Sequence, residues 1–357
     1  MRAAIMRDGA IVVDEFPEPV PEAGEVLVKT LACGICGSDL HALQHAHQFN
    51  QLAPESMRMD LGRDVVMGHE FCAEILDHGP GSDKLLPVGT RVCSMPVMVR
   101  SGQPASVGYA NDIPGGYGER MVLHEPLLLP IENGLATQHA ALTEPMAVGY
   151  HAVMKAQLRD GEVPLVIGCG PVGLAVIAAL KLGGYGPIVA ADFSSRRREL
   201  AVAMGADVVI DPKDHSPYDS WAAVVRDTEA GRQAEVNPLT GEQALPPGVF
   251  FECVGVPGVL DQMMQGATAG CRFVVVGVCM ETDHFQPMTA ITKELNLQFV
   301  LAYTPEEFAH TLHAIAQGEL DVDPLISASV GIDGVAQAFR DLADPEQHAK
   351  ILVEPWR

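Results

Sequence analysis

The sequence is poor in basic residues. It contains 23 Lys and Arg against 46 Asp and Glu, which gives a formal net charge of −23. No basic run and no arginine-rich helix pattern interrupts this acidic balance. Nucleic acids and anionic membrane surfaces attract proteins through clustered positive charge. We therefore expect neither a nucleic acid nor a membrane as a partner of this chain.

Long hydrophobic runs are also missing. No apolar stretch reaches the roughly 20 residues that span a bilayer, and the start, Met1–Ile5, lacks the apolar region of a secretory signal. We therefore expect a cytoplasmic protein whose eight cysteines are reduced thiols. Five of them lie in apolar or glycine-rich runs, where cysteine serves as a small buried residue: Cys72, Cys169, Cys253, Cys271 and Cys279.

The chain is long enough for two domains, with 357 residues of which 48% are hydrophobic. The first third alternates short apolar runs with Gly/Pro turns, which favours a barrel-like β unit. From about residue 145, strands and helices alternate, which predicts a parallel, doubly wound sheet. We expect strands over 164–167, 188–191, 208–210, 249–253 and 272–276, and helices over 171–182 and 195–204. The predicted domains are 1–147 with 288–357, and 148–287, with 213–247 as a polar surface excursion.

A dinucleotide site is indicated by Gly168-Cys-Gly-Pro-Val-Gly173, which follows a predicted strand and opens a predicted helix. Gly168 allows a tight turn, Gly170 allows a pyrophosphate to approach, and Gly173 allows close packing of helix and strand. The helix begins with Pro171 and Val172, and its N-terminus stabilises phosphate charge. Asp192 follows Gly173 by 19 residues, close to the spacing of about 20 at which an acid binds the ribose hydroxyls.

The choice between NAD and NADP depends on the residues after Asp192. Its carboxylate would repel the 2′-phosphate of NADP, so we expect NAD. Arg196, Arg197 and Arg198 follow, however, and a nearby arginine can hold that phosphate. We interpret the three arginines as a solvated first helical turn and keep NADP as the alternative.

Metal-ligand chemistry is concentrated in Cys36, His69 and Glu70, joined by Glu144. A thiolate, an imidazole and carboxylates are ligands that zinc accepts, and three protein ligands leave a position open for substrate. Ser38 and His41 lie beside the first ligand and could carry a proton away. The set suits polarisation of an alcohol or carbonyl oxygen.

The chain resembles the zinc-dependent medium-chain dehydrogenases, especially their sorbitol and butanediol dehydrogenase members. The resemblance rests on Cys-Gly-Ser-Asp-x-His at 36–41, Gly-His-Glu at 68–70, Gly-Gly-x-x-Glu at 115–119, Glu-Pro at 144–145, the glycine motif and Phe-Glu-Cys-Val-Gly at 251–255. It implies a GroES-like β-barrel catalytic domain interrupted by a Rossmann domain, with the active site between them.

The resemblance also implies residue roles. Cys36 and His69 match the family's constant zinc ligands, Glu144 falls at the third ligand position, and Glu70 is an alternative ligand that exchanges with water or substrate. Asp39 matches an acid that orients the ligand histidine, and Ser38 and His41 match the ends of a proton relay through the nicotinamide ribose. Further expected cofactor contacts are Arg197, Val254, Gly277 and Lys350. Of the remaining candidates, Cys33 and His151 are expected to be packing residues and Glu119 a structural residue. His45, His47 and His78 are expected to be solvated loop residues.

The chain departs from the family pattern in two places. Only Cys93 lies between residues 93 and 130, where many members carry four cysteines for a structural zinc, so we expect one catalytic zinc alone. Cys36 and His69 are 33 residues apart, more than is usual, and the extra segment over 42–67 includes 45–49 and 57–59. We expect it to cap the substrate cleft.

The function expected from this resemblance is reversible, NAD-dependent oxidation of a secondary alcohol or polyol to the carbonyl compound. The alternatives are an NADPH-dependent carbonyl reductase on the same scaffold and a non-catalytic nucleotide-binding protein. The resemblance further implies a homodimer or homotetramer. The apolar run over 273–278 is the expected contributor to the contact between subunits.

Overall fold

The computed structural model describes residues 1–53, 55, 58–100, 102–236, 238, 241 and 243–357. The chain divides into two units: Met1–Glu144 with Phe308–Arg357, and Pro145–Glu307. The sequence prediction placed the second junction after residue 287. The structure places it later, because the strand β15 (Asn296–Phe299) still pairs with the parallel sheet of the second unit.

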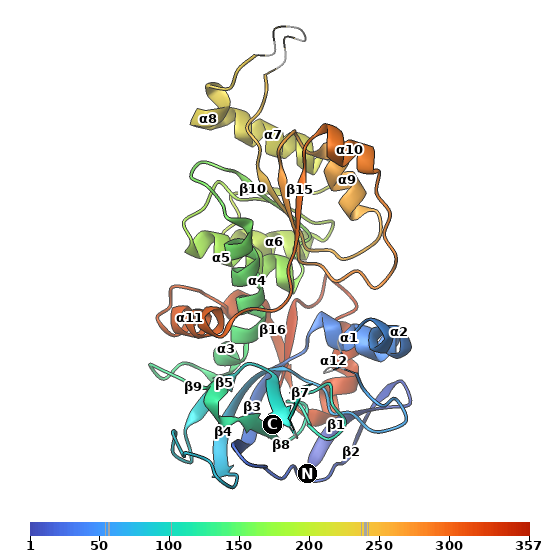
Figure 1. The fold of residues 1–357 in the computed structure, drawn as a ribbon, viewed down its shortest axis with the longest axis vertical. Coiled ribbons are helices and arrows are strands. Elements are labelled where there is room, and N and C mark those ends of the chain that lie inside the picture. The colour runs from blue at the N-terminus through green and yellow to red at the C-terminus, as the bar shows by residue number, and fades with distance from the viewer. Residues whose placement is uncertain (54, 56–57, 101, 237, 239–240, 242) are drawn as a thin grey trace. The chain divides into compact units, whose positions relative to one another are not determined.

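The first unit is built on a seven-stranded sheet with the order β16-β17-β3-β4-β5-β9, in which β8 also pairs with β3 (Figure 1). Its strands are β3 (Glu25–Gly34), β4 (Glu70–His78), β5 (Arg91–Ser94), β8 (Arg120–His124), β9 (Leu128–Pro130), β16 (Ile326–Val330) and β17 (Lys350–Val353). Two hairpins accompany it, β1 (Arg2–Arg7) with β2 (Ala10–Glu15), and β6 (Val97–Arg100) with β7 (Gln103–Ser106). Short helices are α1 (Gly37–Gln44), α2 (Ala46–Leu52), α3 (Thr137–Ala141) and α12 (Val335–Asp341), with 3-10 turns η2 (Glu125–Leu127), η3 (Asp323–Leu325) and η4 (Ile332–Gly334).

The long strands β3 and β4 form the centre of this sheet, and they pair antiparallel along most of their length. The last strand, β17, lies on the other side of β3, with Leu352 opposite Gly34. The end of the chain therefore lies beside the end of β3, and this places Lys350 close to the segment that follows Gly34.

The second unit contains a six-stranded parallel sheet with the order β12-β11-β10-β13-β14-β15. Its elements are β10 (Pro164–Ile167), α5 (Pro171–Leu182), β11 (Val189–Ala191), α6 (Ser195–Met204), β12 (Val208–Ile210), α7 (Pro217–Asp227), α8 (Glu229–Arg232), β13 (Val249–Glu252), α9 (Val259–Gly266), β14 (Arg272–Val275), α10 (Pro287–Thr292) and β15. The helices α4 (Thr143–Ala156) and α11 (Pro305–Ala316) lie at the junctions with the first unit. The predicted strands and helices are confirmed to within one residue, and so is the doubly wound sheet.

Helices cover both faces of the parallel sheet, with α5 and α6 on one side and α9 and α10 on the other (Figure 1). One face packs Leu165, Phe250 and Phe273 against α7 and α9 in a fully buried cluster. The prediction of 213–247 as a polar surface excursion was wrong for its first part. The segment includes α7, whose apolar residues recur at helical spacing, and its Trp221 is buried edge-on against Phe250.

The expectation that residues 273–278 help to join subunits stays a prediction. Phe273 and Val274 are buried in β14, which pairs with β13 on one side and β15 on the other. The two edge strands of the sheet are β12 and β15. No helix among the described residues is both long and apolar enough to cross a membrane.

The extra segment over 42–67 begins with the end of α1 and continues as α2. Of the two stretches singled out in it, 46–49 lies in α2 with His45 between the two helices, whereas residue 57 is outside the described residues. His47 is exposed, as expected, and Phe49 is buried. The segment is thus attached to the unit through a packed aromatic side chain.

Candidate functional site

Cys36 stands where β3 gives way to α1. It is the N-cap of that helix, and its extended backbone turns the thiol away from the strand. Asp39 lies three residues later, in the first turn, and its Oδ2 accepts a hydrogen bond from the Cys36 backbone N at 3.1 Å. This reciprocal capping fixes the backbone of the thiol-bearing residue.

His69 and Glu70 are placed by a glycine and a strand. Gly68 has φ of +102°, a conformation that favours glycine, and a Cβ there would lie 2.8 Å from the Tyr117 ring and 2.9 Å from Cys33 Sγ. The chain then enters β4 at Glu70. Both side chains are buried, and Glu70 is fully so.

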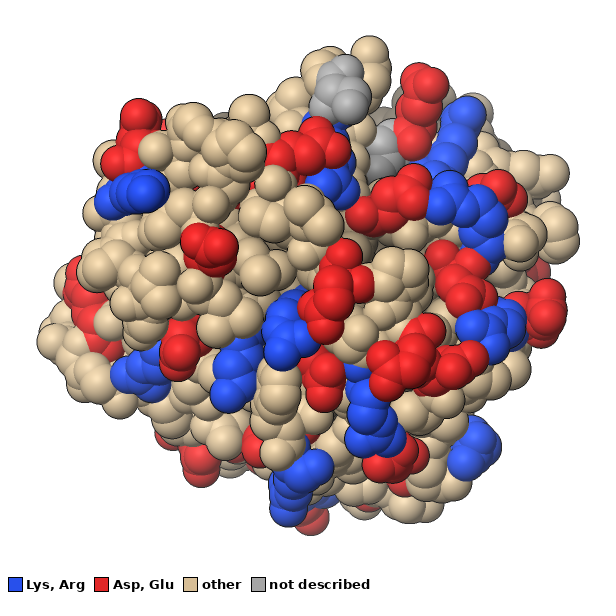
Figure 2. Space-filling model, turned by 90° about the horizontal axis from the view of Figure 1, so that it is seen from below, with Lys and Arg blue, Asp and Glu red and all other residues tan. Residues whose placement is uncertain are grey.

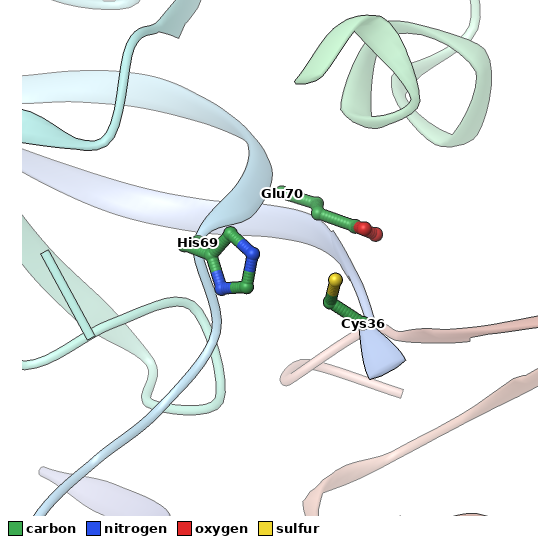
Figure 3. Close-up of side chains that lie close together, drawn as sticks. All are labelled: Cys36, His69 and Glu70. Carbon is green, nitrogen blue, oxygen red and sulfur yellow. The ribbon is translucent and has the colours of Figure 1, made fainter. Parts of the chain in front are cut away.

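The structure brings Cys36, His69 and Glu70 together into one group, the sole group of potential metal ligands found among the described residues (Figure 3). Their ligand atoms all lie within 4.8 Å of one another. A thiol, an imidazole and a carboxylate match the donor types of a catalytic zinc site, in which three protein ligands leave a further position for substrate. The residues therefore fit a zinc ion.

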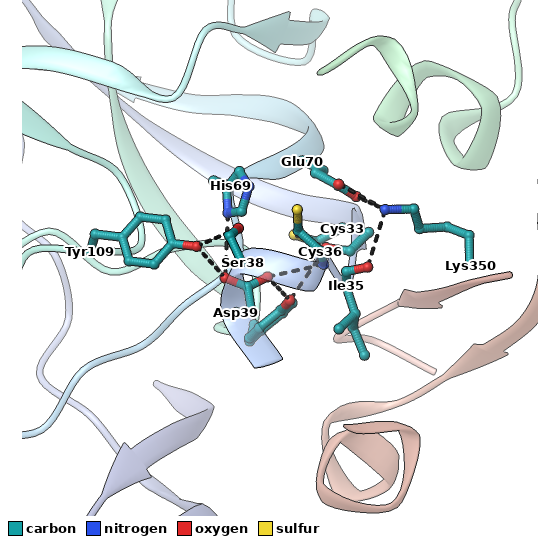
Figure 4. A network of polar contacts seen from close by, with 11 residues as sticks. Cys33, Ile35, Cys36, Ser38, Asp39, His69, Glu70, Tyr109 and Lys350 are labelled. Atoms are coloured by element: carbon teal, nitrogen blue, oxygen red, sulfur yellow. Dashed lines mark hydrogen bonds and ion pairs between the residues drawn. The ribbon is translucent and has the colours of Figure 1, made fainter. Parts of the chain in front are cut away.

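A buried carboxylate supports this group from below (Figure 4). Asp39 Oδ1 accepts a hydrogen bond from the Tyr109 hydroxyl at 2.9 Å, and Oδ2 accepts one from the Tyr117 hydroxyl at 2.6 Å. Asp39 Oδ1 also lies 3.4 Å from His69 Nδ1, but the two atoms do not meet the geometry of a hydrogen bond. The ring's Nε2 is left for a metal, the arrangement in which an outer carboxylate orients a ligand histidine.

The electrostatics of Asp39 favour its ionised form. Complete burial raises the pKa of the carboxyl, but the positive field of His69 and the hydrogen bonds from Tyr117 and the Cys36 N–H outweigh burial, so the pKa lies below its ordinary value. Asp39 is thus an acceptor-only group at neutral pH.

Lys350 provides a second buried charge at the site. Its Nζ donates to both Glu70 oxygens, at 2.7 and 2.8 Å, and to the Ile35 carbonyl at 3.1 Å. Burial lowers the pKa of this ammonium, but the Glu70 carboxylate more than compensates and raises it. The ion pair holds Glu70 beside Cys36 and His69 and competes with a metal for its oxygens. The cofactor contact expected of Lys350 stays a prediction.

Glu144 is outside the three-residue group. It lies in the first turn of α4, partly buried, and its charge contributes to the raised pKa of Lys350. Of the two acids expected at the metal, the structure therefore brings only Glu70 close to Cys36 and His69. The ligand roles of both Glu70 and Glu144 stay predictions. Cys33 is buried beneath Gly68 and Gly116 and lies outside the group as well.

Ser38 and His41, the two residues expected to relay a proton, both lie in α1. Ser38 Oγ is 2.8 Å from the Tyr109 hydroxyl, a partner that the sequence did not predict. His41 is half-buried, and its ring lies 6.5 Å from that of His45. Burial, together with the neighbouring His45, lowers the pKa of His41 below its usual value of 6.5.

Sequence reasoning missed Tyr109 and Tyr117 as parts of this site. Tyr117 lies in the Gly-Gly-Tyr-Gly stretch at 115–118, whose glycines are typical of a turn, and nothing in the local pattern aims its hydroxyl at Asp39. Tyr109 lies 70 residues beyond Asp39, so only the folded chain brings the two together.

The glycine turn of the second unit has the geometry of a phosphate cradle. Gly168 follows β10 with φ of +90°, and Gly170 is the extended N-cap of α5. A Cβ on Gly173 would collide with the Gly168 carbonyl oxygen. The expected contacts Val254 and Gly277 follow β13 and β14. The glycine turn, Val254 and Gly277 therefore lie at the carboxyl ends of neighbouring parallel strands, where open sheets of this kind bind ligands.

Asp192 ends β11 and is held by two backbone groups. Its Oδ2 accepts from Cys169 N at 2.7 Å and its Oδ1 from Ser194 N at 2.8 Å. Arg197 Nη1 lies 4.0 Å from Asp192 Oδ2, and Arg197 Nε is buried without a hydrogen-bond partner. Arg198 binds Asp211, and Arg196 pairs with Glu199 on the surface.

Comparison with known proteins shows two matching family models: "Zinc-binding dehydrogenase" over residues 171–317 and "Alcohol dehydrogenase GroES-like domain" over 22–133. The chain is similar to (R,R)-butanediol dehydrogenase of Bacillus subtilis, with 30% identity over 97% of this chain and 96% of the relative. The crystal structure of 2R,3R-butanediol dehydrogenase from Bacillus subtilis matches with a TM-score of 0.81 at 29% identity, over 99% of each chain. Sorbitol dehydrogenase of Bacillus subtilis is 26% identical over 100% of this chain and 98% of the relative.

Elemental analysis tests the proposed metal site. We expect about one zinc per chain, as a single Cys/His/Glu group implies. Cys36→Ser should lose it, because the substitution removes the thiolate, whereas the control Cys279→Ser, in the second unit, should keep it. Two stoichiometric zincs in the wild type would contradict the expectation of one site, and full zinc content in Cys36→Ser would contradict the choice of ligand.

Proposed function

The chain belongs to the family of zinc-dependent medium-chain dehydrogenases, and we propose that it is an NAD-dependent member that interconverts a secondary alcohol or polyol and its carbonyl compound at one catalytic zinc. Membership makes it an oxidoreductase of the alcohol dehydrogenase type. The observation that carries the finer proposal is the close grouping of Cys36, His69 and Glu70.

In this proposal, Cys36 and His69 hold the metal, with Glu70 or Glu144 as the third ligand. A bound zinc ion would act as a Lewis acid that lowers the pKa of a substrate hydroxyl, and bound NAD would accept the hydride. The chain's own contribution is orientation, since Asp39 fixes the His69 ring and Lys350 governs the position of Glu70. Release of Glu70 from Lys350 would let its carboxylate approach the metal position.

Proton removal is assigned to the residues of α1. Ser38 would accept the hydroxyl proton of the alcohol and pass it through the cofactor ribose to His41. The lowered pKa of His41 supports this role, because it keeps the imidazole neutral and able to accept a proton at pH 7.

The choice of NAD rests on Asp192. Its carboxylate is fixed at the end of β11, the position from which an acid accepts hydrogen bonds from the adenosine ribose. It would also repel a 2′-phosphate. The observation that favours the NADP alternative is Arg197, whose guanidinium lies near both Asp192 and the glycine turn.

A substrate screen with both cofactors tests the proposal. Reduced nicotinamide absorbance should rise with 2,3-butanediol, sorbitol and related secondary alcohols, and kcat/KM for NAD should exceed that for NADP by on the order of 100-fold. Asp192→Ser should reduce or invert this ratio, whereas the control Asp211→Ser, which removes a partner of Arg198, should change it little. A wild type that prefers NADP would favour the reductase alternative, and a zinc-loaded protein without any turnover would favour the non-catalytic one.

The pH dependence tests the role of His41. A base with a lowered pKa is deprotonated at neutral pH and becomes protonated as the pH falls below the ordinary histidine range, so kcat for alcohol oxidation should fall there. His41→Gln should lower kcat at pH 7 on the order of tenfold, less than a direct general base contributes because solvent partly replaces the relay. The difference in kcat between His41→Gln and the wild type should shrink as the pH rises. The exposed His47→Gln serves as control, and equal pH profiles for wild type and His41→Gln would refute the role.

We further propose a small-molecule substrate and a homodimer. Figure 2 shows a face on which acidic and basic side chains are interspersed, without a continuous basic tract on that face. The edge strand β15, by contrast, has no strand partner beyond β14 among the described residues. Phe299 of β15 is exposed, and so is Leu301, which follows the strand; Met288 and Ile291 of α10 are exposed as well. An unpaired apolar edge suits pairing with a second copy of itself about a two-fold axis.

Light scattering coupled to size-exclusion chromatography tests the dimer. Leu301→Asp, which places a charge on this edge, should lower the measured mass from two chains towards one. Leu85→Asp changes an exposed leucine of the first unit in the same way and should leave the mass unchanged. Loss of the dimer in Leu85→Asp alone would place the contact elsewhere.

A further inference from the structure

Tyr109 joins the relay serine to the carboxylate beneath the metal ligands (Figure 4). Its hydroxyl lies 2.8 Å from Ser38 Oγ and donates to Asp39 Oδ1 at 2.9 Å. Its ring packs 5.3 Å from the ring of His69. The side chain is only 2% exposed, so these contacts are made out of reach of bulk water.

The direction of the hydrogen bond between Tyr109 and Ser38 follows from proton counting. A phenol has one proton, and Tyr109 donates it to Asp39, which is an acceptor-only group when ionised. The phenol oxygen therefore faces Ser38 as an acceptor, and Ser38 must be the donor. With its own proton committed to Tyr109, the Ser38 oxygen has its lone pairs left for other donors.

We propose that Tyr109 is a positioning residue that orients Ser38 as the hydrogen-bond acceptor for the substrate hydroxyl. The inference rests on the proposed function and deepens it. While the alcohol is bound, Tyr109 holds the serine proton away from the alcohol. As the alcohol proton binds Ser38 Oγ, the serine's own O–H bond breaks and that proton passes to the cofactor ribose, after rotation about the Cβ–Oγ bond has turned it from Tyr109 towards that acceptor.

The position of Tyr109 is set in turn by the extra segment. Phe49 of α2 stacks on the Tyr109 ring at 5.4 Å and is itself buried. The segment over 42–67 thus contributes an aromatic wall to the phenol that contacts Ser38. This gives the departure from the usual spacing between Cys36 and His69 a role at the site.

Tyr117 provides a matched control. It is also fully buried, and its hydroxyl donates to the same Asp39 carboxylate through the other oxygen, but its hydrogen bonds are to Asp39 and the Gly34 carbonyl. Tyr109→Phe and Tyr117→Phe therefore each remove one hydroxyl and one hydrogen bond to Asp39. They differ in the contact with Ser38.

The experiment measures kcat and KM for oxidation of 2,3-butanediol by the zinc-loaded protein, in each variant alone and combined with Ser38→Ala. Tyr109→Phe should lower kcat roughly tenfold, the effect of one lost hydrogen bond in the reacting complex, with KM for NAD unchanged within about twofold. Tyr117→Phe should lower kcat about twofold. In the Ser38→Ala background, Tyr109→Phe should cost nothing further, because its effect acts through the serine.

Zinc release to a chelator supplies a readout independent of turnover. Tyr109→Phe should lose zinc no faster than Tyr117→Phe, because its hydrogen bond to Asp39, at 2.9 Å, is the longer of the two. Faster loss from Tyr109→Phe alone, or an undiminished tenfold cost in the Ser38→Ala background, would overturn the inference and indicate an effect on the ligands. If the wild type is active and Tyr109→Phe has the same kcat, the inference about Tyr109 is refuted and the proposed function stands. If the wild type is inactive on every alcohol, the proposed function itself is refuted.

Discussion

The carboxylate of Asp39 is the point on which the site depends. It is fully buried, yet it accepts hydrogen bonds from the Cys36 backbone, Tyr109 and Tyr117, and it faces the His69 ring. An isolated buried carboxylate is costly, and one with several donors is stabilised. Because its donors come from α1, from the segment after β7 and from the glycine turn at 115–118, a single charge fixes three distant parts of the chain. The Cys36 thiol, the His69 imidazole and, through Tyr109, the Ser38 hydroxyl are all positioned by this one carboxylate.

A second buried charge pair sets the position of Glu70, one of the two acids proposed as the third ligand. Lys350 binds both oxygens of Glu70, and neither residue is exposed. Breaking such a pair is costly unless the freed charges find other partners, and a divalent cation is such a partner for the carboxylate. The last strand of the chain, β17, is therefore part of the chemistry as well as of the sheet, since it carries the lysine to Glu70.

The sequence predicted well where chemistry follows local pattern. The glycine motif, the strand before it and the acid after β11 are local features, and the fold and the family are confirmed. It failed where contacts join remote residues. Tyr109 and Lys350 reach the site from 70 and 280 residues away from their partners. Composition also misled in one place, because α7 lies in a stretch interpreted as a polar excursion although its apolar residues recur at helical spacing.

The central claim is that one zinc ion binds between Cys36, His69 and an acid. X-ray absorption at the zinc edge of the loaded protein tests it most directly. The account predicts one sulfur neighbour at about 2.3 Å, with the remaining neighbours nitrogen or oxygen at about 2.0–2.2 Å. Loss of the sulfur neighbour in Cys36→Ser would agree with it. A shell of three or four sulfur atoms, or a sulfur neighbour that persists in Cys36→Ser, would contradict the account.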